Sequence, residues 1–288
     1  MIAGSAGPAR ARSWLLATVG ATATVGVFAL LLGSVVSIDG EPPAASAQAA
    51  EILHRAADTA RADRTPAPRA DQFILRTTKG FAPVAGQGEP ATTLTRSWMS
   101  VDGTHDGLIW VSDPPAGGRQ STVIPGCLNG RAREWSPAAD GTLLNSTRPC
   151  TPTPAYLNDL PTDATGMLHH LQRMSGGGTM QSNERTFANV GGLIQSGYLP
   201  AQSRAALYEA ATKIPGVVAN QTMTDAAGRT GIGVSLAGDI DRYELLFDSN
   251  TYQFLGWQVV PKAENAGQQA RRGVTLNLTI VDHAGQTP

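Results

Sequence analysis

The sequence has almost no net charge and very few lysines. Its 288 residues carry a formal net charge of −1 at pH 7, which argues against a nucleic-acid-binding surface and offers no long-range attraction to an acidic partner. Nearly all of its positive charge comes from arginine, since the only lysines are Lys79, Lys213 and Lys262. A GC-rich genome produces such a bias without selection on function, so we give individual arginines little weight at this stage.

Cysteine is equally scarce, with only Cys127 and Cys150 in the whole chain. No cysteine follows the apolar run near the N-terminus, which excludes a lipidated N-terminus. A single pair in an oxidising compartment usually forms a disulfide. Closing a loop of about 24 residues would contribute roughly 3 kcal/mol through the entropy of the unfolded chain. A redox or metal site is the alternative, but redox pairs are two residues apart and no further ligand lies close in sequence.

One long stretch has no charged residue at all, Trp14–Ile38. At 1.5 Å per residue, a helix of this length can cross a bilayer core of roughly 30 Å. Arg10 and Arg12 precede it, whereas Asp39 and Glu41 follow it, and the basic flank of a span usually stays in the cytoplasm. The sequence therefore predicts a single-pass protein of the cell membrane whose C-terminal part lies outside the cytoplasm.

A cleaved signal peptide is the alternative for this N-terminal region, because Ala45-Ser46-Ala47 resembles a cleavage site. The apolar run of about 25 residues exceeds the 7 to 15 typical of signal peptides, which favours a retained anchor. We thus expect a cytoplasmic tail (1–13), a span (14–38), a linker (39–47), one exported domain (48–283) and a short tail (284–288). So short a cytoplasmic tail makes the span a tether, and any signal would pass through a partner helix in the membrane, where Gly20, Ala23 and Gly26 offer a packing face.

The exported part alternates between helical and strand-like patterns. Ala49–Asp63 has apolar residues at helical spacing, and strand-like runs follow it. Three helices are predicted in the middle, the first with Thr162 as its N-cap. The last third reads as an antiparallel meander in which Leu255, Trp257 and Val259 share one face. The expected fold class is α+β, with a curved, half-barrel-like antiparallel sheet and helices packed on one of its faces.

Aromatic residues fall on the predicted strands. On a curved sheet they would line an apolar groove for a lipid or a partner peptide, or else they would fill an ordinary core; the sequence leaves both open. An apolar cavity of several hundred Å³ would favour the groove, whereas a face filled by helices would exclude it. The residues proposed to line the groove are Phe73, Trp98, Trp110, Phe247 and Trp257.

Motifs that come near to catalytic or metal-binding signatures each lack an essential part. Gly233–Ala237 approaches a nucleophile elbow but lacks the second glycine, and its Ser235 lies within a strand. His169-His170 has no carboxylate at a zinc-site spacing, the turn around His105 lacks the Glu of a calcium loop, and Ser175–Thr179 lacks the lysine of a phosphate-binding loop. We therefore predict no enzyme activity, cofactor or metal.

Several segments resemble a known family. The pieces PRADQFILR, LPTDATGMLHHL, ALYEAATKIPGV, TDAAGRTGIGVSL and YELLFDSNTYQFLGWQVV, of which the last three lie within Ala206–Val260, resemble an uncharacterised family of actinobacterial membrane-anchored proteins. That family is often encoded beside an extracytoplasmic-function sigma factor and has no established activity. More loosely, the order of elements looks like the half-barrel of bacterial lipoprotein carriers and of sensor domains that bind anti-sigma factors.

These features favour a membrane-tethered, extracytoplasmic binding domain without catalytic activity. Its expected ligand is a lipid or another apolar molecule, or a protein partner, which includes a partner in the membrane; nucleic acid is excluded. The alternative is a regulatory sensor in an envelope-stress sigma-factor system. Because so few residues precede the span, the resemblance does not extend to direct contact with a sigma factor.

Overall fold

The computed structural model describes residues 44–82, 91–112, 120–136, 142–176, 182–225, 227–262 and 271–288. The chain divides into two compact units, Met1–Val36 and Ser37–Pro288, and the fold below belongs to the second. The predicted span Trp14–Ile38 lies outside the described residues. Within the described ranges, no helix is both long and apolar enough to cross a membrane.

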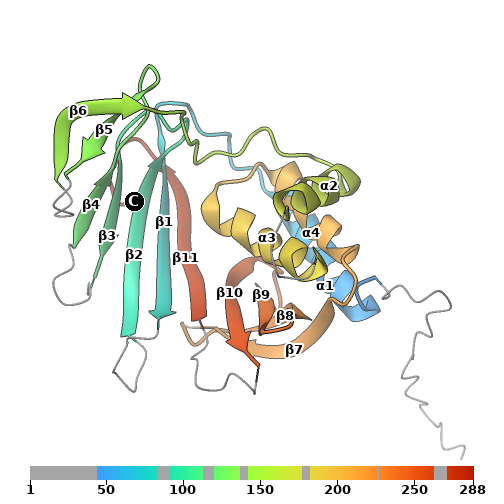
Figure 1. The fold of residues 1–288 in the computed structure, drawn as a ribbon. Coiled ribbons are helices and arrows are strands. Elements are labelled where there is room, and N and C mark those ends of the chain that lie inside the picture. Colours follow the sequence, from blue (N-terminus) through green and yellow to red (C-terminus); the bar gives the residue numbers. More distant parts are fainter. Residues whose placement is uncertain are drawn as a thin grey trace, which may run out of the picture. The chain divides into compact units, whose positions relative to one another are not determined.

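Nine strands form one antiparallel sheet in the order β4-β3-β2-β1-β11-β10-β9-β8-β7 (Figure 1). Two meanders, one from each end of the described chain, therefore meet where β1 pairs with β11. The strands are β1 (Phe73–Ala82), β2 (Ala91–Ser100), β3 (Gly107–Val111), β4 (Ser121–Ile124), β7 (Val218–Thr224), β8 (Thr230–Ala237), β9 (Asp241–Asp248), β10 (Phe254–Pro261) and β11 (Arg271–Val281).

The pairing of β1 with β11 decides which side chains share a face. Ile74 is opposite Ile280 and Arg76 is opposite Leu278, so these four side chains lie on one face. Leu75 is opposite Thr279 and points to the other face. Both faces carry buried apolar residues at this junction, and Arg76 is a charged residue that shares its face with Ile74, Leu278 and Ile280.

Four helices complete the fold. They are α1 (Ala47–Ala62), α2 (Ala164–Met174), α3 (Ser182–Ser196) and α4 (Ala201–Thr212). The Ser46 hydroxyl caps α1 by accepting from the Ala49 N–H, and the Asp163 carboxylate caps α2 by accepting from the Gly166 N–H. The predicted cap of α2, Thr162, is thus one residue too early. An α+β class with a large antiparallel sheet is confirmed.

The helices pack on one another and on one part of the sheet. Helix α1 lies along α4, α2 contacts α3 and α4, and the sheet contacts of α1 and α3 are with β7, β8 and β9. Both α1 and α4 turn alanine-rich faces toward the core, including Ala56, Ala60, Ala206 and Ala210. Small side chains let two helices approach closely. The helix-covered part of the sheet is therefore β7–β9.

A bulge explains one wrong assignment within the meander. The register between β9 and β10 shifts between Phe254 and Gly256, which reverses the alternation locally. Leu255 therefore belongs to a small cluster with Met223 and Leu246, whereas Trp257 packs against the main core. The predicted common face of these two residues is not present.

The two cysteines flank a hairpin whose described residues are mostly exposed. Strands β5 (Arg131–Trp135) and β6 (Leu143–Pro149) form a separate hairpin with mostly exposed residues. Cys127 and Cys150 form a disulfide next to it, with Cα atoms 5.9 Å apart. The Cys127 N–H also donates to the Gly103 carbonyl. The disulfide thus closes the base of the hairpin, and the Cys127 hydrogen bond links this base to the turn between β2 and β3.

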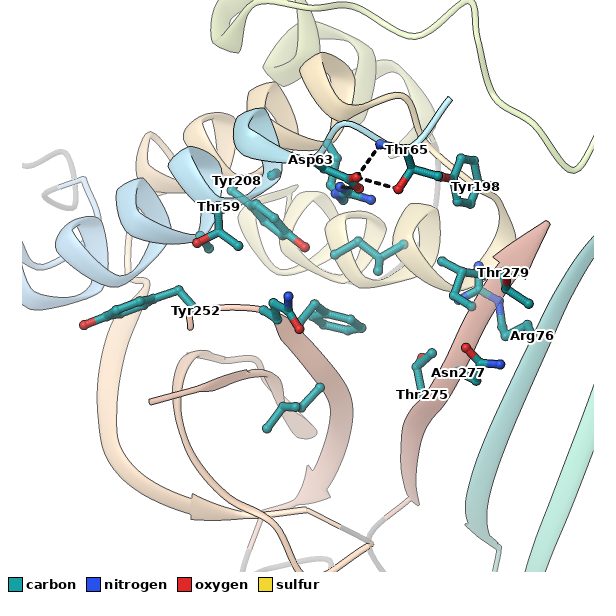
Figure 2. A pocket seen from close by; sticks show the side chains of 18 of the residues that line it. Thr59, Asp63, Thr65, Arg76, Tyr198, Tyr208, Tyr252, Thr275, Asn277 and Thr279 are labelled. Atoms are coloured by element: carbon teal, nitrogen blue, oxygen red, sulfur yellow. Dashed lines mark hydrogen bonds and ion pairs between the residues drawn. The ribbon is translucent and has the colours of Figure 1, made fainter. Parts of the chain in front are cut away.

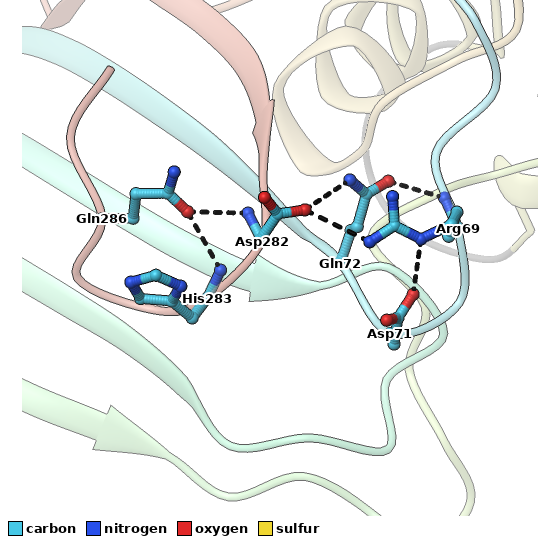
Figure 3. Close-up of polar contacts among 6 residues, drawn as sticks. All are labelled: Arg69, Asp71, Gln72, Asp282, His283 and Gln286. Carbon is cyan, nitrogen blue, oxygen red and sulfur yellow. Dashed lines mark hydrogen bonds and ion pairs between the residues drawn. The ribbon is translucent and has the colours of Figure 1, made fainter.

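Polar contacts hold the chain after β11 beside the approach to β1 (Figure 3). The Asp282 carboxylate accepts from the Gln72 amide at 2.9 Å and from the Arg69 guanidinium at 3.2 Å. These hydrogen bonds lower the pKa of Asp282 below its usual range. All of these groups are exposed, so their contribution to stability is small, and we read them as local fasteners and not as a binding site.

Candidate functional site

A cavity of about 970 Å³ lies between the helices and the β10–β11 part of the sheet (Figure 2). Such a volume is near the upper end of the roughly 300–1,000 Å³ found for small-molecule sites. Its helical wall includes Ala56, Thr59, Ala60, Ile194 and Tyr208, and its sheet wall includes Phe254, Leu255, Leu276, Leu278 and Ile280.

The cavity exists because β10 and β11 separate partway along their length. They pair only over Gly256–Val259 and Arg271–Val274. From Thr275 onward β11 pairs with β1 alone among the described strands. The close approach of β10 to β11 just before they separate requires the glycine at position 256, since a Cβ there would lie 2.5 Å from the Gly273 carbonyl oxygen. One edge of β11 thus borders the cavity without a strand beside it.

Arg229 occupies the point where the two strands separate. Its guanidinium donates to the carbonyl oxygens of Leu255 and Thr275, both at 3.3 Å. Its Nε also donates to the buried Asp225 carboxylate at 2.6 Å. The charge of Arg229 is therefore balanced, and its role is to hold the fork between β10 and β11.

A second arginine of the wall is balanced in the same way. Arg204 of α4 donates to the Asp63 carboxylate at 2.6 Å, and Thr65 donates to that carboxylate through its N–H and its hydroxyl. Burial alone would raise the pKa of Asp63, but these hydrogen bonds outweigh burial and lower it to about 2. The end of α1 is thereby joined to α4 at the rim.

Arg76 of β1 differs from these two arginines. Its guanidinium donates to the Gly197 carbonyl oxygen at 2.8 Å, and no carboxylate of the described residues forms an ion pair with it. Burial lowers the pKa of Arg76 to about 10, which is still high enough for the group to be charged at neutral pH. Figure 2 shows Arg76 at the β1–β11 end of the cavity and Tyr252 toward the opposite end.

Three aromatic rings contact one another edge-to-face along one wall of the cavity. Tyr208 meets Phe247 edge-on with centroids 5.4 Å apart, and Phe247 meets Phe254 edge-on at 5.9 Å. Burial raises the pKa of Tyr208 to about 12, so its hydroxyl stays protonated. Tyr208 and Phe254 line the cavity, and Phe247 is buried behind them.

None of the five residues proposed to line a groove borders this cavity. Phe73 and Trp98 are buried in a cluster with Leu75, against which Trp110 packs, and they lie on the face opposite Arg76 because strand alternation places them there. The Trp98 indole donates to the Gln286 carbonyl, so the C-terminal tail covers this cluster. Phe247 is core, and Trp257 lines a separate pocket of about 140 Å³ beside α3.

The residues that the prediction missed are arginines, tyrosines and the apolar side of β11. The sequence did contain a signal for Arg76. It directly follows Ile74 and Leu75 in a predicted strand, and a charged residue at that place interrupts an apolar run. The general excess of arginine had led us to disregard it. Tyr198, Tyr208 and Tyr252 stand in a helix or in loops, where alternation gives no information.

The near-catalytic motifs have structural places. Ser235 is buried in the middle of β8 and is not at a turn. Asp102 accepts from Ser100 and Thr104, which forms the turn that holds His105. His169 and His170 lie on α2, and in the part of the chain that the structure describes no group of three or more His, Cys, Asp or Glu could hold a metal ion. Residues 177–179 of the glycine-rich loop lie outside the described residues.

Comparison with known proteins gives only distant similarities. No protein-family model matches the sequence, and no curated protein sequence matches it. Among solved structures, the MucA/MucB complex of Pseudomonas aeruginosa has a TM-score of 0.31 at 13% identity, over 84% of this chain and 59% of that one. A Vibrio parahaemolyticus domain described as an outer membrane lipoprotein-sorting protein has a TM-score of 0.29 at 10% identity, over 83% and 95%.

A LolA superfamily protein from Nitrosomonas europaea is also similar, with a TM-score of 0.23 at 10% identity over 83% of this chain and 94% of that one. The chain spans less than two thirds of the MucB-complex chain that it matches. No family match supports the resemblance to the actinobacterial family. Two of the solved structures, the lipoprotein-sorting domain and the LolA superfamily protein, are of the carrier class named in the looser resemblance. Such low scores carry no argument about ligand or partner, so both are argued from the cavity.

Proposed function

We propose that this chain binds an elongated amphiphilic molecule in the cavity between its helices and β10–β11, without carrying out chemistry on it. The single observation that supports the proposal is the cavity itself. Its volume of about 970 Å³ suits a ligand with a long apolar part.

The two kinds of wall suit the two parts of an amphiphile. Ile194, Phe254, Leu278 and Ile280 offer apolar surface along the cavity, and burying a chain against such surface is favourable by about 25 cal/mol per Å². Polar groups gather where β1 and β11 meet, and Arg76 is the charged one among them. A purely apolar molecule would leave these polar groups without partners.

The location of this binding domain forms part of the proposal. Trp14–Ile38 would tether it to the cell membrane, with residues 48–283 as the exported domain. The cavity would then lie outside the cytoplasm, within reach of amphiphiles that leave the membrane. The disulfide between Cys127 and Cys150 is compatible with such an oxidising compartment.

A protein partner is the second candidate, and a specific observation favours it. Beyond Thr275, the edge of β11 toward β10 has no neighbouring strand in the described chain. An extended peptide could add to such an edge through main-chain hydrogen bonds. This would be the route by which a regulatory sensor in an envelope-stress system engages a partner.

The proposal is tested by photo-crosslinking with the purified full chain in digitonin, a detergent without an alkyl chain. A palmitic acid analogue with a photoreactive group in its chain should label peptides that contain cavity residues of β11 and α4. The variant Leu276→Glu, which places a charge on a wall residue that is 42% exposed, should reduce labelling at least about tenfold.

Leu128→Glu is the matched control, because Leu128 is 62% exposed and does not line the cavity. This variant should be labelled like the unchanged chain. Labelling spread over the surface, or unaffected by Leu276→Glu, would rule out the cavity as the binding site. The second candidate is correct if no amphiphile labels the cavity and an added peptide instead slows the hydrogen exchange of the β11 amides.

A further inference from the structure

The charged residues that line the cavity do not balance. Within the described residues they are Asp63, Arg76, Arg204 and Arg229. Asp63 balances Arg204, and Asp225, which lies behind the wall, balances Arg229. Arg76 is left with a carbonyl oxygen as its hydrogen-bond partner. The cavity therefore carries one uncompensated positive charge at a defined place.

A partly buried cation without a counter-charge is costly to the folded protein. Removal of a charge from water is offset only when an opposite charge or several hydrogen bonds replace the lost hydration. The guanidinium of Arg76 has five N–H donors in a flat fork, and in the described structure one nitrogen is used, by the Gly197 carbonyl. The remaining donors are available to a group that enters the cavity.

The fork geometry selects the chemistry of that group. Two parallel N–H donors match the two oxygens of a carboxylate or of a phosphate, and such paired bonds are among the strongest that arginine makes. Apolar side chains accompany the polar groups beside Arg76, because Leu278 is directly opposite it across the strands and Ile280 lies one pair further along. A small inorganic anion would leave this apolar surface exposed to water.

Building on the proposed function, we infer that Arg76 binds the anionic group of an amphiphile, a carboxylate or a phosphate. The apolar chain of that amphiphile extends from Arg76 along β11 toward Tyr252 at the other end of the cavity (Figure 2). The shared chemistry is an anionic head on a long chain, as in a fatty acid or an alkyl phosphate.

The test measures head-group preference by competition. Purified full chain in digitonin is labelled with the photoreactive palmitic acid analogue, and unlabelled palmitate, cetyl phosphate or cetyl alcohol is added. The three competitors have the same chain and differ in the head group. Palmitate or cetyl phosphate should compete at least about tenfold better than the neutral alcohol, a factor that corresponds to about 1.4 kcal/mol, and the better of the two identifies the head group.

Variants then assign this preference to Arg76. In Arg76→Gln the anionic competitors should fall to the level of cetyl alcohol, so that the ratio between anionic and neutral competitors approaches one. Arg76→Lys keeps the charge without the fork and should retain part of the preference. Arg96→Gln is the matched control, since Arg96 is on the neighbouring strand β2 and stacks on Trp110 on the other face of the sheet.

The outcomes separate the two proposals. If cetyl alcohol competes as well as palmitate with the unchanged chain, Arg76 does not select the head group and this inference is wrong, although amphiphile binding stands. If no competitor reduces labelling of the cavity, the proposed function fails as well. The measured quantity is a ratio between competitors. A general loss of stability in Arg76→Gln would weaken the binding of all three competitors together, so it would not mimic the expected change in their ratio. Should that variant not fold, an unchanged preference in Arg76→Lys would refute the role of the fork.

Discussion

The two ends of the nine-stranded sheet are stabilised in different ways. At the β7–β10 end, helices α1, α3 and α4 form the largest hydrophobic cluster with the strands. At the β1–β4 end, the buried cluster of Phe73, Leu75, Trp98 and Val281 is small, and the C-terminal tail and the disulfide-linked hairpin lie against this end. The cavity lies where the helix-covered part ends, so the proposed ligand site is located where neither kind of stabilisation is complete.

The largest expected effect comes from the helix-covered end. Phe247→Ala would remove a fully buried ring that contacts Tyr208 and Phe254, and such substitutions cost about 3–5 kcal/mol of unfolding free energy. At the other end, Trp110 is only partly buried, so Trp110→Ala should lower the free energy of unfolding by only about 1–2 kcal/mol. Urea unfolding of the full chain in a non-ionic detergent measures both. Equal losses would show that the two ends do not differ.

Loss of the disulfide should lower the free energy of unfolding by less than Phe247→Ala does, and its effect should be confined to the β1–β4 end. Replacing Cys127 and Cys150 together by serine removes a cross-link between residues 23 apart in sequence, which corresponds to about 3 kcal/mol in the chain-entropy model. Hydrogen exchange should become faster in β5, β6 and the turn that holds Asp102, and the exchange of α1 and α4 should not change. Faster exchange throughout the helices would mean that the two ends unfold as one unit.

The smallest effect is the pH-dependent link at the rim of the cavity. The pKa of Asp63 is about 2 in the folded chain against 3.8 for the free group. Because folding lowers this pKa, the contribution is fully present above about pH 4 and is lost as the pH falls toward about 2, and it amounts to about 2 kcal/mol.

The variant Asp63→Asn tests this link. It should be about 2 kcal/mol less stable than the unchanged chain near pH 7, and the difference should shrink as the pH falls from about 4 to 2. Thermal unfolding of both proteins across this pH range is the measurement. A difference that stays constant with pH would assign the loss to packing and not to the charge of Asp63.

The regular parts of the fold could be predicted because their patterns are local. Helical spacing predicted a helix over Ala49–Asp63, and the structure has α1 over Ala47–Ala62. The α2 cap was displaced by one residue because Thr162 and Asp163 are both good caps, and only the helix geometry chooses between them.

The cavity could not be predicted, since it depends on where two strands separate. Nothing in the alternation of β11 shows that its pairing with β10 ends at Val274. The face of Phe73 and Trp98 followed from the pairing of β1 with β2 and β11, strands that are distant in sequence. Arg76 alone was visible in advance, as a charge that interrupts an apolar strand.

The pairing of β1 with β11 also constrains the order in which the chain can fold. β11 is the last strand of the sheet in the chain, yet it is a central one and forms a wall of the cavity. During folding the first meander must wait, with one edge of β1 uncovered, until the last strand of the chain is available to pair with it. Long-range pairing of this kind slows folding and exposes strand edges meanwhile. Because β11 forms a wall of the cavity, the cavity is complete only after this last pairing has formed.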